Sequence, residues 1–189
     1  MSPITHALLG WLVSCTDPRL TRRERGWVTV AGVAPDVDAL GTLPQILTAR
    51  GAHPVYWGSD FHHVLGHNLL AAAIVACVAA AFARRRGVTA ALAFASFHLH
   101  ILGDLVGSRG GDGYTWPMAY LFPFDDRFQL SWSGQWELDA WPNFVITALA
   151  LAATFVLAWR RGYSIVELLS PRADRAFVDA LRARVARRG

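Results

Sequence analysis

Histidine and aspartate residues stand at unusual positions in this sequence, inside or directly beside apolar segments. They are His6, Asp36, Asp38, His62, His63, His67, His98, His100 and Asp104. Protonatable side chains are costly to bury in apolar surroundings, so each of them needs a physical reason to be there. Metal coordination is one such reason, because imidazole and carboxylate groups together suit Zn²⁺, Mn²⁺ or Fe²⁺.

The spacing of these residues predicts that several of them converge. Residues four apart share one side of a helix, which pairs His63 with His67 and His100 with Asp104. The two pairs lie on opposite sides of the turn RRRG in the sequence. At ~1.5 Å per residue, the distances of His67 and His100 from that turn, measured along their helices, differ by ~7 Å. The two aspartates of the motif PDVD point to the same side if that loop is extended. A structural role, in which the imidazole only forms hydrogen bonds within the fold, is an alternative to metal binding for His53, His63 and His98.

The elements that must position these residues are mostly helical. Apolar segments predict helices or short apolar elements at 3–16, 26–34, 60–84, 88–106 and 143–159. Ser59 or Asp60 is the predicted N-cap of the third of these segments. Residues 35–60 are rich in Pro, Gly and Asp and predict a loop with one helical turn near 43–50. Residues 107–142 carry many glycines, prolines and aromatic residues, and we expect them to be irregular.

Composition favours a membrane protein. The chain is 53% hydrophobic and 17% charged, well below the roughly 25% charged residues of soluble domains. Its arginine clusters adjoin apolar runs, as cytoplasmic flanks of membrane helices do, and this pattern argues against nucleic acid as a partner. We therefore expect an all-α helical bundle embedded in or associated with the inner (cytoplasmic) membrane, as a multi-pass protein with a cytoplasmic C-terminal tail.

The expected division of the chain is one membrane domain and one tail. Residues 1–165 form the helical metal-binding membrane domain, and residues 166–189 form a basic amphipathic helix. Ser170 is the predicted N-cap of this tail helix and Pro171 its first residue. Its arginine-rich faces would suit a surface of lipid headgroups.

Four of these motifs together resemble the YdjM-like family of membrane-bound, metal-dependent hydrolases. THALLG, APDVD, HHVLGHNLL and HLHILGD, followed by G…WP…PF, have the order and approximate separations of the family motifs over residues 5–124. The resemblance implies a divalent metal, Zn²⁺ foremost, held by His6, Asp36, Asp38, His62, His67, His100 and Asp104. The set is also distantly similar to the metal cluster of zinc-dependent phospholipases C. Because no histidine follows His100, we expect one or two ions rather than three.

Two departures from the family pattern concern the segment around residues 62–68. His62-His63 stands where the family has His-Arg, and Gly66-His67-Asn68 stands where it has Thr-His-Ser. The missing arginine and threonine bear on substrate contacts more than on the metal.

The function that these motifs imply is hydrolysis of a phosphoester or lipid-like substrate through a metal-activated water. His67, His100 and Asp104 are the expected core ligands, with Asp36 terminal or bridging. The aromatic residues of segment 114–141 would lie at the bilayer interface and guide the substrate. The expected partners are therefore the lipid bilayer and a small-molecule or lipid phosphoester.

The remaining polar residues have expected roles in proton transfer and in substrate binding. Asp38 would take a proton from the water or hold a second ion. His62 or His6 would protonate the leaving group or complete the second site. Arg109 lies in the glycine-rich stretch GSRGGDG, where its guanidinium would contact a phosphate.

Three other interpretations compete with the hydrolase. His67 and His100 could be the axial pair of a b-type haem, although haem iron takes no carboxylate partners. The histidines and aspartates could form a proton or ion relay in a membrane protein without enzymatic activity. The chain could also be a soluble α-helical domain that buries all of these helices.

Overall fold

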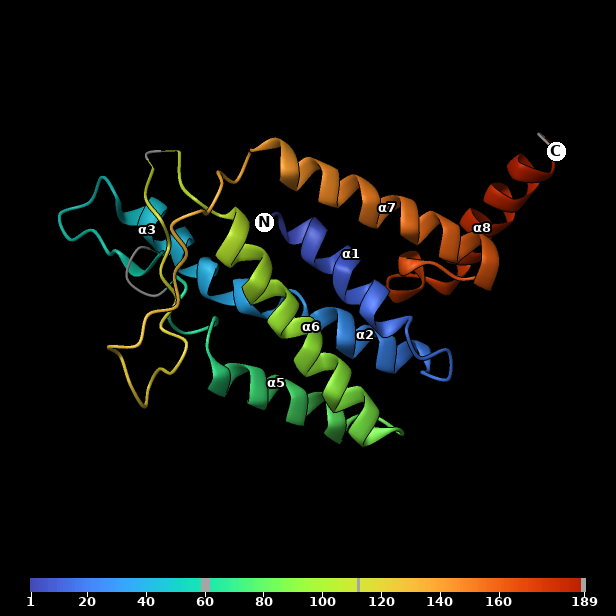
Figure 1. Ribbon diagram of the computed structural model, residues 1–189, viewed down its shortest axis with the longest axis horizontal. Coiled ribbons are helices and arrows are strands. Elements are labelled where there is room, and N and C mark those ends of the chain that lie inside the picture. Colours follow the sequence, from blue (N-terminus) through green and yellow to red (C-terminus); the bar gives the residue numbers. More distant parts are fainter. Residues whose placement is uncertain (59–61, 112, 188–189) are drawn as a thin grey trace.

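The computed structural model describes residues 1–58, 62–111 and 113–187 of the 189-residue chain, and over these residues the fold is all-helical. The elements are α1 (Pro3–Ser14), α2 (Arg22–Ala31), the 3₁₀ helix η1 (Ala34–Gly41), α3 (Thr42–Thr48), α5 (Leu69–Ala81), α6 (Arg86–Gly107), α7 (Trp141–Arg161), the 3₁₀ helix η2 (Ile165–Leu168) and α8 (Pro171–Ala186). Figure 1 shows α1, α2, α5, α6 and α7 running along the length of the molecule, with α3 at one end and α8 at the other.

Small residues let three of these helices approach closely. A Cβ atom added to Gly10 of α1 would lie 2.9 Å from Ser96 Oγ of α6, and one added to Gly32 would lie 2.7 Å from the same atom. Side chains at either position would push the helices apart, so the glycines fix the crossing of α1, α2 and α6. The crossing places the start of α1 beside the end of α6.

Helix α5 is shorter than the sequence predicts. The predicted helix over 60–84 is wrong at its start, because α5 begins at Leu69 with Asn68 as its N-cap. Asn68 Oδ1 accepts a hydrogen bond from the backbone N–H of Ala71, and its Nδ2 donates to the carbonyl groups of Val64 and Leu65. Asparagine side chains favour such caps over helix interiors. The predicted N-cap at Ser59 or Asp60 lies outside the described residues.

The segment that precedes α5 is therefore a turn and not a helix. His62, His63 and His67 lie on this turn, so the predicted i,i+4 face of His63 and His67 does not exist. The motif PDVD is also not extended, because Asp36 and Asp38 lie in the 3₁₀ helix η1. Helices α1, α6, α7 and α8 form close to their predicted positions, with Ser170 as the N-cap of α8, whereas α2 begins at Arg22, four residues before the element predicted at 26–34.

Helices α6 and α7 are long and apolar enough to cross a membrane. Helix α7 exposes large apolar side chains along much of its length. Those exposed by more than a third are Trp141, Phe144, Val145, Leu149, Leu151, Phe155, Val156 and Trp159. A soluble protein rarely exposes so continuous an apolar surface, whereas lipid chains cover it without cost. This surface argues against the interpretation in which every helix is buried in a soluble domain.

The C-terminal helix is held by a buried polar contact to the segment that follows α7 and by an aromatic contact to α7 itself. The carboxylate of Asp174 accepts hydrogen bonds from the backbone N–H and the hydroxyl of Ser164, at 2.8 and 2.6 Å. Phe177 of α8 packs against Phe155 of α7 with ring centroids 5.5 Å apart. Whether residue 165 is a domain boundary stays a prediction.

Candidate metal centre

Four side chains from three parts of the chain meet at the end of α6. His100 and Asp104 lie one helical turn apart on α6, His67 comes from the turn before α5, and Asp36 comes from η1. Each of the four offers one ligand atom, and these atoms all lie within 4.8 Å of one another. His67, His100 and Asp104 are almost completely buried, and Asp36 is partly exposed. The structure thus brings together four of the seven predicted metal-binding residues as one donor set.

The distances within this set fit a metal ion. His67 Nε2 lies 3.2 Å from His100 Nε2 and 3.5 Å from Asp104 Oδ2. His100 Nε2 lies 3.1 Å from Asp104 Oδ2 and 3.6 Å from Asp36 Oδ1. Ligand atoms at 2.0–2.1 Å from a tetrahedral zinc ion are separated from each other by about 3.3 Å. The side chains therefore already hold the spacing that a tetrahedral ion requires.

The protonation of the two central histidines also fits a metal. His100 Nδ1 lies 2.9 Å from the carbonyl oxygen of Gly32, and His67 Nδ1 lies 3.0 Å from Asp38 Oδ2. Both of these oxygens only accept hydrogen bonds, so both Nδ1 atoms carry the proton. In the neutral rings the Nε2 lone pairs then point at each other across 3.2 Å. Only a shared proton or a cation can stabilise that arrangement, and a carboxylate or carbonyl behind a ligating histidine is the usual support of a metal site.

Asp38 holds two histidines in place. Its Oδ1 lies 2.8 Å from His62 Nδ1, and its Oδ2 accepts from His67 Nδ1 and from the backbone N–H groups of His63 and Gly66, each at 3.0 Å. Burial alone would raise the pKa of Asp38, but the hydrogen bonds from His62 and His67 outweigh burial and hold that pKa far below its usual value. A carboxylate with so low a pKa is a poor proton acceptor. Asp38 is placed to orient His62 and His67.

His6 supports Asp104 from the side opposite the donor set. His6 Nε2 lies 3.0 Å from Asp104 Oδ1, and the His6 ring stacks on the His100 ring with centroids 3.7 Å apart. The amino group of Met1 contacts the same Asp104 oxygen. Because Oδ1 is engaged in this way, Oδ2 is the Asp104 oxygen that faces His67 and His100. His6 Nδ1 is buried without a hydrogen-bond partner.

A cavity of about 180 Å³ opens beside the donor set. The residues that line it are Met1, Asp36, His62, His63, Asp104, Ser108, Trp116 and Leu138. The Trp116 ring contacts His62 and His63 edge-on, with centroid distances of 5.4 and 5.5 Å. The cavity is large enough for water and a small polar group, and it reaches Asp36 and Asp104 directly.

His63 lies in an unusual environment next to this cavity. Its φ angle is +66°, a conformation that is uncommon for residues other than glycine. Burial and the nearby histidines His67 and His62 lower its pKa to about 3, so the ring is neutral at physiological pH. Its Nδ1 is buried without a partner.

Arg109, His53 and His98 lie away from the donor set. The Arg109 guanidinium pairs with Glu137 at 3.4 Å, and Arg109 is not among the described residues that line the cavity. His98 binds the Phe94 carbonyl group and the Tyr120 hydroxyl. His53 is exposed, and the described donor set does not include it.

Sequence reasoning missed the residues that close the end of α6. Gln135 is buried, and its amide nitrogen Nε2 donates to the carbonyl group of Asp104 at 2.8 Å. Asn143 Nδ2 donates to the carbonyl group of Gly107 at 2.9 Å, and its Oδ1 accepts from Trp136. These amides satisfy carbonyl groups that the helix end leaves open. Nothing in a single sequence distinguishes them from surface amides.

The geometry disfavours two of the competing interpretations. A haem with His67 and His100 as axial ligands needs a porphyrin ring between the two imidazoles, and Nε2 atoms 3.2 Å apart leave no room for it. A relay across the bundle needs titratable groups along its length. Between the donor set and the buried charged side chains Glu24, Arg25 and Glu167 at the opposite end, the described bundle buries hydroxyls such as Thr29 and Ser96, which do not titrate.

The fold and the site define an all-helical membrane protein with a buried His/Asp cluster that could hold a metal ion. Residues 1–170 match the family of the YdjM inner membrane protein, and the chain belongs to this family. The family description and the two apolar helices both indicate a membrane location. Searches among curated proteins and among solved structures found no significant match.

Proposed function

We propose that this protein is a membrane-bound, metal-dependent hydrolase of phosphoesters. The observation that carries the proposal is the convergence of His67, His100, Asp36 and Asp104 beside a cavity that is also lined by His62, a histidine oriented by the carboxylate of Asp38. Zn²⁺ is the preferred ion because two imidazoles and two carboxylates at tetrahedral spacing suit it, and Mn²⁺ or Fe²⁺ could replace it. When bound there, a divalent metal would polarise a phosphoryl oxygen and lower the pKa of a water from about 15.7 to about 7.

His62 is the residue best placed to move protons. Asp38 binds its Nδ1, so Nε2 is the ring nitrogen that can exchange a proton at the cavity. In hydrolysis the water oxygen forms a bond to phosphorus, the ester P–O bond breaks, and the water proton is taken up while the leaving alcohol receives one. His62 Nε2 can accept the first proton and donate the second. Asp38 then stabilises the imidazolium ion and acts as a positioning residue.

His63 and Trp116 would hold the substrate. His63 lines the cavity, its ring is neutral, and its buried Nδ1 has no hydrogen-bond partner, which together support a hydrogen bond from this ring to a phosphate oxygen. His63 stands where family members carry arginine, so a phosphate-contacting role at this position is consistent with the family pattern. Trp116 packs against both histidines and keeps bulk water away from them.

The proposal predicts that His62→Gln separates metal binding from hydrolysis. In detergent micelles with zinc supplied, the variant should keep its zinc content and lose about 10²- to 10⁴-fold in kcat on phosphomonoesters and phosphodiesters, the usual contribution of a general acid–base group. His98→Gln is the matched control, because His98 lies outside the cavity and should leave kcat unchanged. A zinc-loaded, folded wild type without activity above background on either ester class would contradict the proposal.

A further inference from the structure

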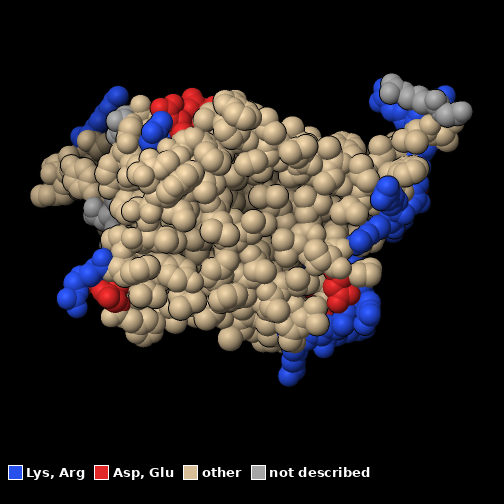
Figure 2. Space-filling model, viewed as in Figure 1, with Lys and Arg blue, Asp and Glu red and all other residues tan. Residues whose placement is uncertain are grey.

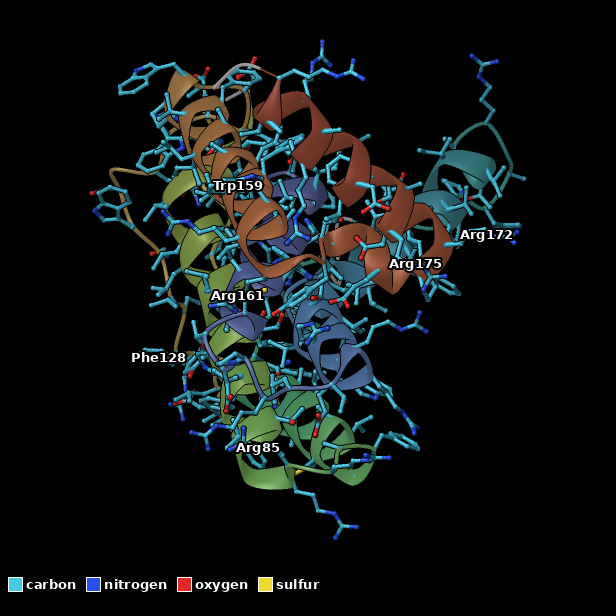
Figure 3. All side chains as sticks on the ribbon, turned by 90° about the vertical axis from the view of Figure 1, so that its right-hand side faces the viewer. Arg85, Phe128, Trp159, Arg161, Arg172 and Arg175 are labelled. Atoms are coloured by element: carbon cyan, nitrogen blue, oxygen red, sulfur yellow. The ribbon has the colours of Figure 1, made fainter. Side chains whose placement is uncertain are left out.

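The arginines of the chain gather at one end of the bundle. Fifteen of the eighteen lie in residues 15–25, 82–88 and 159–189, and the chain has no lysine. The structure brings these three segments together, because α1, α5 and α7 all end there and α2 and α6 both begin there. Figure 2 shows most of the blue surface at the right-hand end of the molecule, and Figure 3 shows Arg85, Arg161, Arg172 and Arg175 from that end.

The candidate metal centre lies at the opposite end. Helix α6 begins at Arg86, and Asp104 lies eighteen residues further along it, which is about 27 Å at 1.5 Å per residue. The hydrocarbon layer of a bilayer is about 30 Å thick. An ion bound beside Asp104 would therefore lie near the far boundary of the hydrocarbon layer, at the depth of lipid headgroups.

Two tryptophans on α7 mark the same two boundaries. Trp159 and Trp141 are 43% and 74% exposed, and they lie eighteen residues apart, again about 27 Å. Tryptophan is enriched at both interfaces of a membrane, with its ring at the headgroup level. Trp159 adjoins Arg160 and Arg161, whereas Trp141 lies at the end that holds the metal centre.

Apolar side chains project next to the metal centre at this second boundary. Leu40, Leu43, Ile46 and Leu47 of η1 and α3 are each exposed by 60% or more, and Asp36 is part of the same 3₁₀ helix. Their exposure in water would be unfavourable, whereas insertion among lipid chains at the interface removes that cost. These four side chains define an apolar ridge beside the donor set.

Short membrane loops rich in arginine stay in the cytoplasm. We propose that the arginine-rich end faces the cytoplasm, that the metal centre opens to the extracytoplasmic face, and that it receives the phosphate headgroup of a lipid from the outer leaflet. The lipid substrate rests on the proposed hydrolase function, whereas the orientation in the membrane does not. The apolar ridge seats the protein in that leaflet and brings the lipid phosphate to the level of the ion.

Cysteine labelling in spheroplasts tests the orientation without any measurement of activity. The background carries Cys15→Ala and Cys77→Ala, which removes both native cysteines. Arg127→Cys places a thiol at the site end, where the arginine side chain is 93% exposed, and Arg172→Cys places one at the start of α8. A membrane-impermeant maleimide should label the thiol at 127 in intact spheroplasts, and the thiol at 172 only after lysis. The reverse pattern, or equal labelling of both thiols before lysis, would overturn the proposed orientation.

Two substrates that share one headgroup test the lipid source. Phosphatidic acid in phosphatidylcholine vesicles should be hydrolysed, and Leu47→Ser on the ridge should lower kcat/KM for it about tenfold, as expected from the loss of one buried leucine. The same variant should leave any turnover of glycerol phosphate unchanged. Equal kcat/KM for both substrates would overturn the lipid assignment but not the hydrolase function. Turnover of neither substrate would overturn the lipid assignment and count against the hydrolase function, while the labelling result would stand.

Discussion

His100→Ala is expected to abolish stoichiometric zinc binding and to leave the helical bundle folded. The variant removes one of two imidazole nitrogens that converge at 3.2 Å, and no neighbouring group can take its place on α6. Loss of a supporting residue alone typically weakens metal affinity 10- to 100-fold, so loss of a direct ligand should weaken it by at least about 100-fold. Zinc content measured by mass spectrometry on detergent-purified protein, with chelator competition for affinity, gives the result.

The matched control is His98→Ala, on the same helix. His98 binds Tyr120 and the Phe94 carbonyl group, so its loss should leave zinc binding intact. Asp38→Asn should give an intermediate loss of about 10- to 100-fold, because Asp38 contacts a ligand and not the donor set itself. Equal zinc content in wild type and His100→Ala would show that this cluster is not the metal site.

The same titrations should depend on pH in a defined direction. Burial lowers the pKa of His67, but hydrogen bonds with Asp104 and Asp38 outweigh burial and raise it to about 9. Below pH 9 the metal-free protein therefore carries a proton on His67 that zinc must displace. Apparent zinc affinity should fall about tenfold for each pH unit below 9 and become independent of this proton above 9.

The helical architecture could be predicted from the sequence because apolar periodicity and arginine flanks are local signals. Helices α6, α7 and α8 form close to their predicted positions for this reason. The start of α5 could not be predicted in this way, because Asn68 ends the turn through its own side chain and α5 begins only after it. When a capping residue starts a helix in the middle of a continuous apolar and histidine-rich stretch, the spacing of apolar residues along the sequence does not change at that point.

The convergence of the site depends on contacts between distant segments, and these are harder to predict. A Cβ atom on Gly66 would lie 2.1 Å from the carbonyl oxygen of Pro35, so only glycine lets the turn before α5 pack on η1. This close approach brings the Gly66 N–H within 3.0 Å of Asp38 and positions His67. The sequence shows Gly66 only as a departure from the family pattern. Its packing role follows from the three-dimensional arrangement of residues that lie 28 to 31 positions apart in the sequence.

Glu167→Ala is expected to lower the free energy of unfolding more than any other single substitution proposed above. Arg25 donates to Glu167 through Nε and Nη2, each at 2.6 Å, and both side chains are less than 10% exposed. The guanidinium group also donates to the Leu20 carbonyl group and lies 4.1 Å from the Tyr163 ring centroid. Removing one partner of a buried pair leaves the other charge uncompensated and typically costs about 3–5 kcal/mol. For a chain of this size that is a decrease of about 10 °C in Tm.

Asp17→Ala provides the comparison for a partly exposed pair. Asp17 and Arg85 have side chains exposed by 21% and 32%, so solvent screens this pair and the variant should lower Tm much less than Glu167→Ala does. Replacing both partners at once, as in Arg25→Met with Glu167→Met, removes the uncompensated charge and should recover most of the loss. Thermal unfolding in detergent, followed by circular dichroism, measures all three. If Glu167→Ala and Asp17→Ala shifted Tm equally, the Arg25–Glu167 pair would not be the contact that fastens the C-terminal segment to α2.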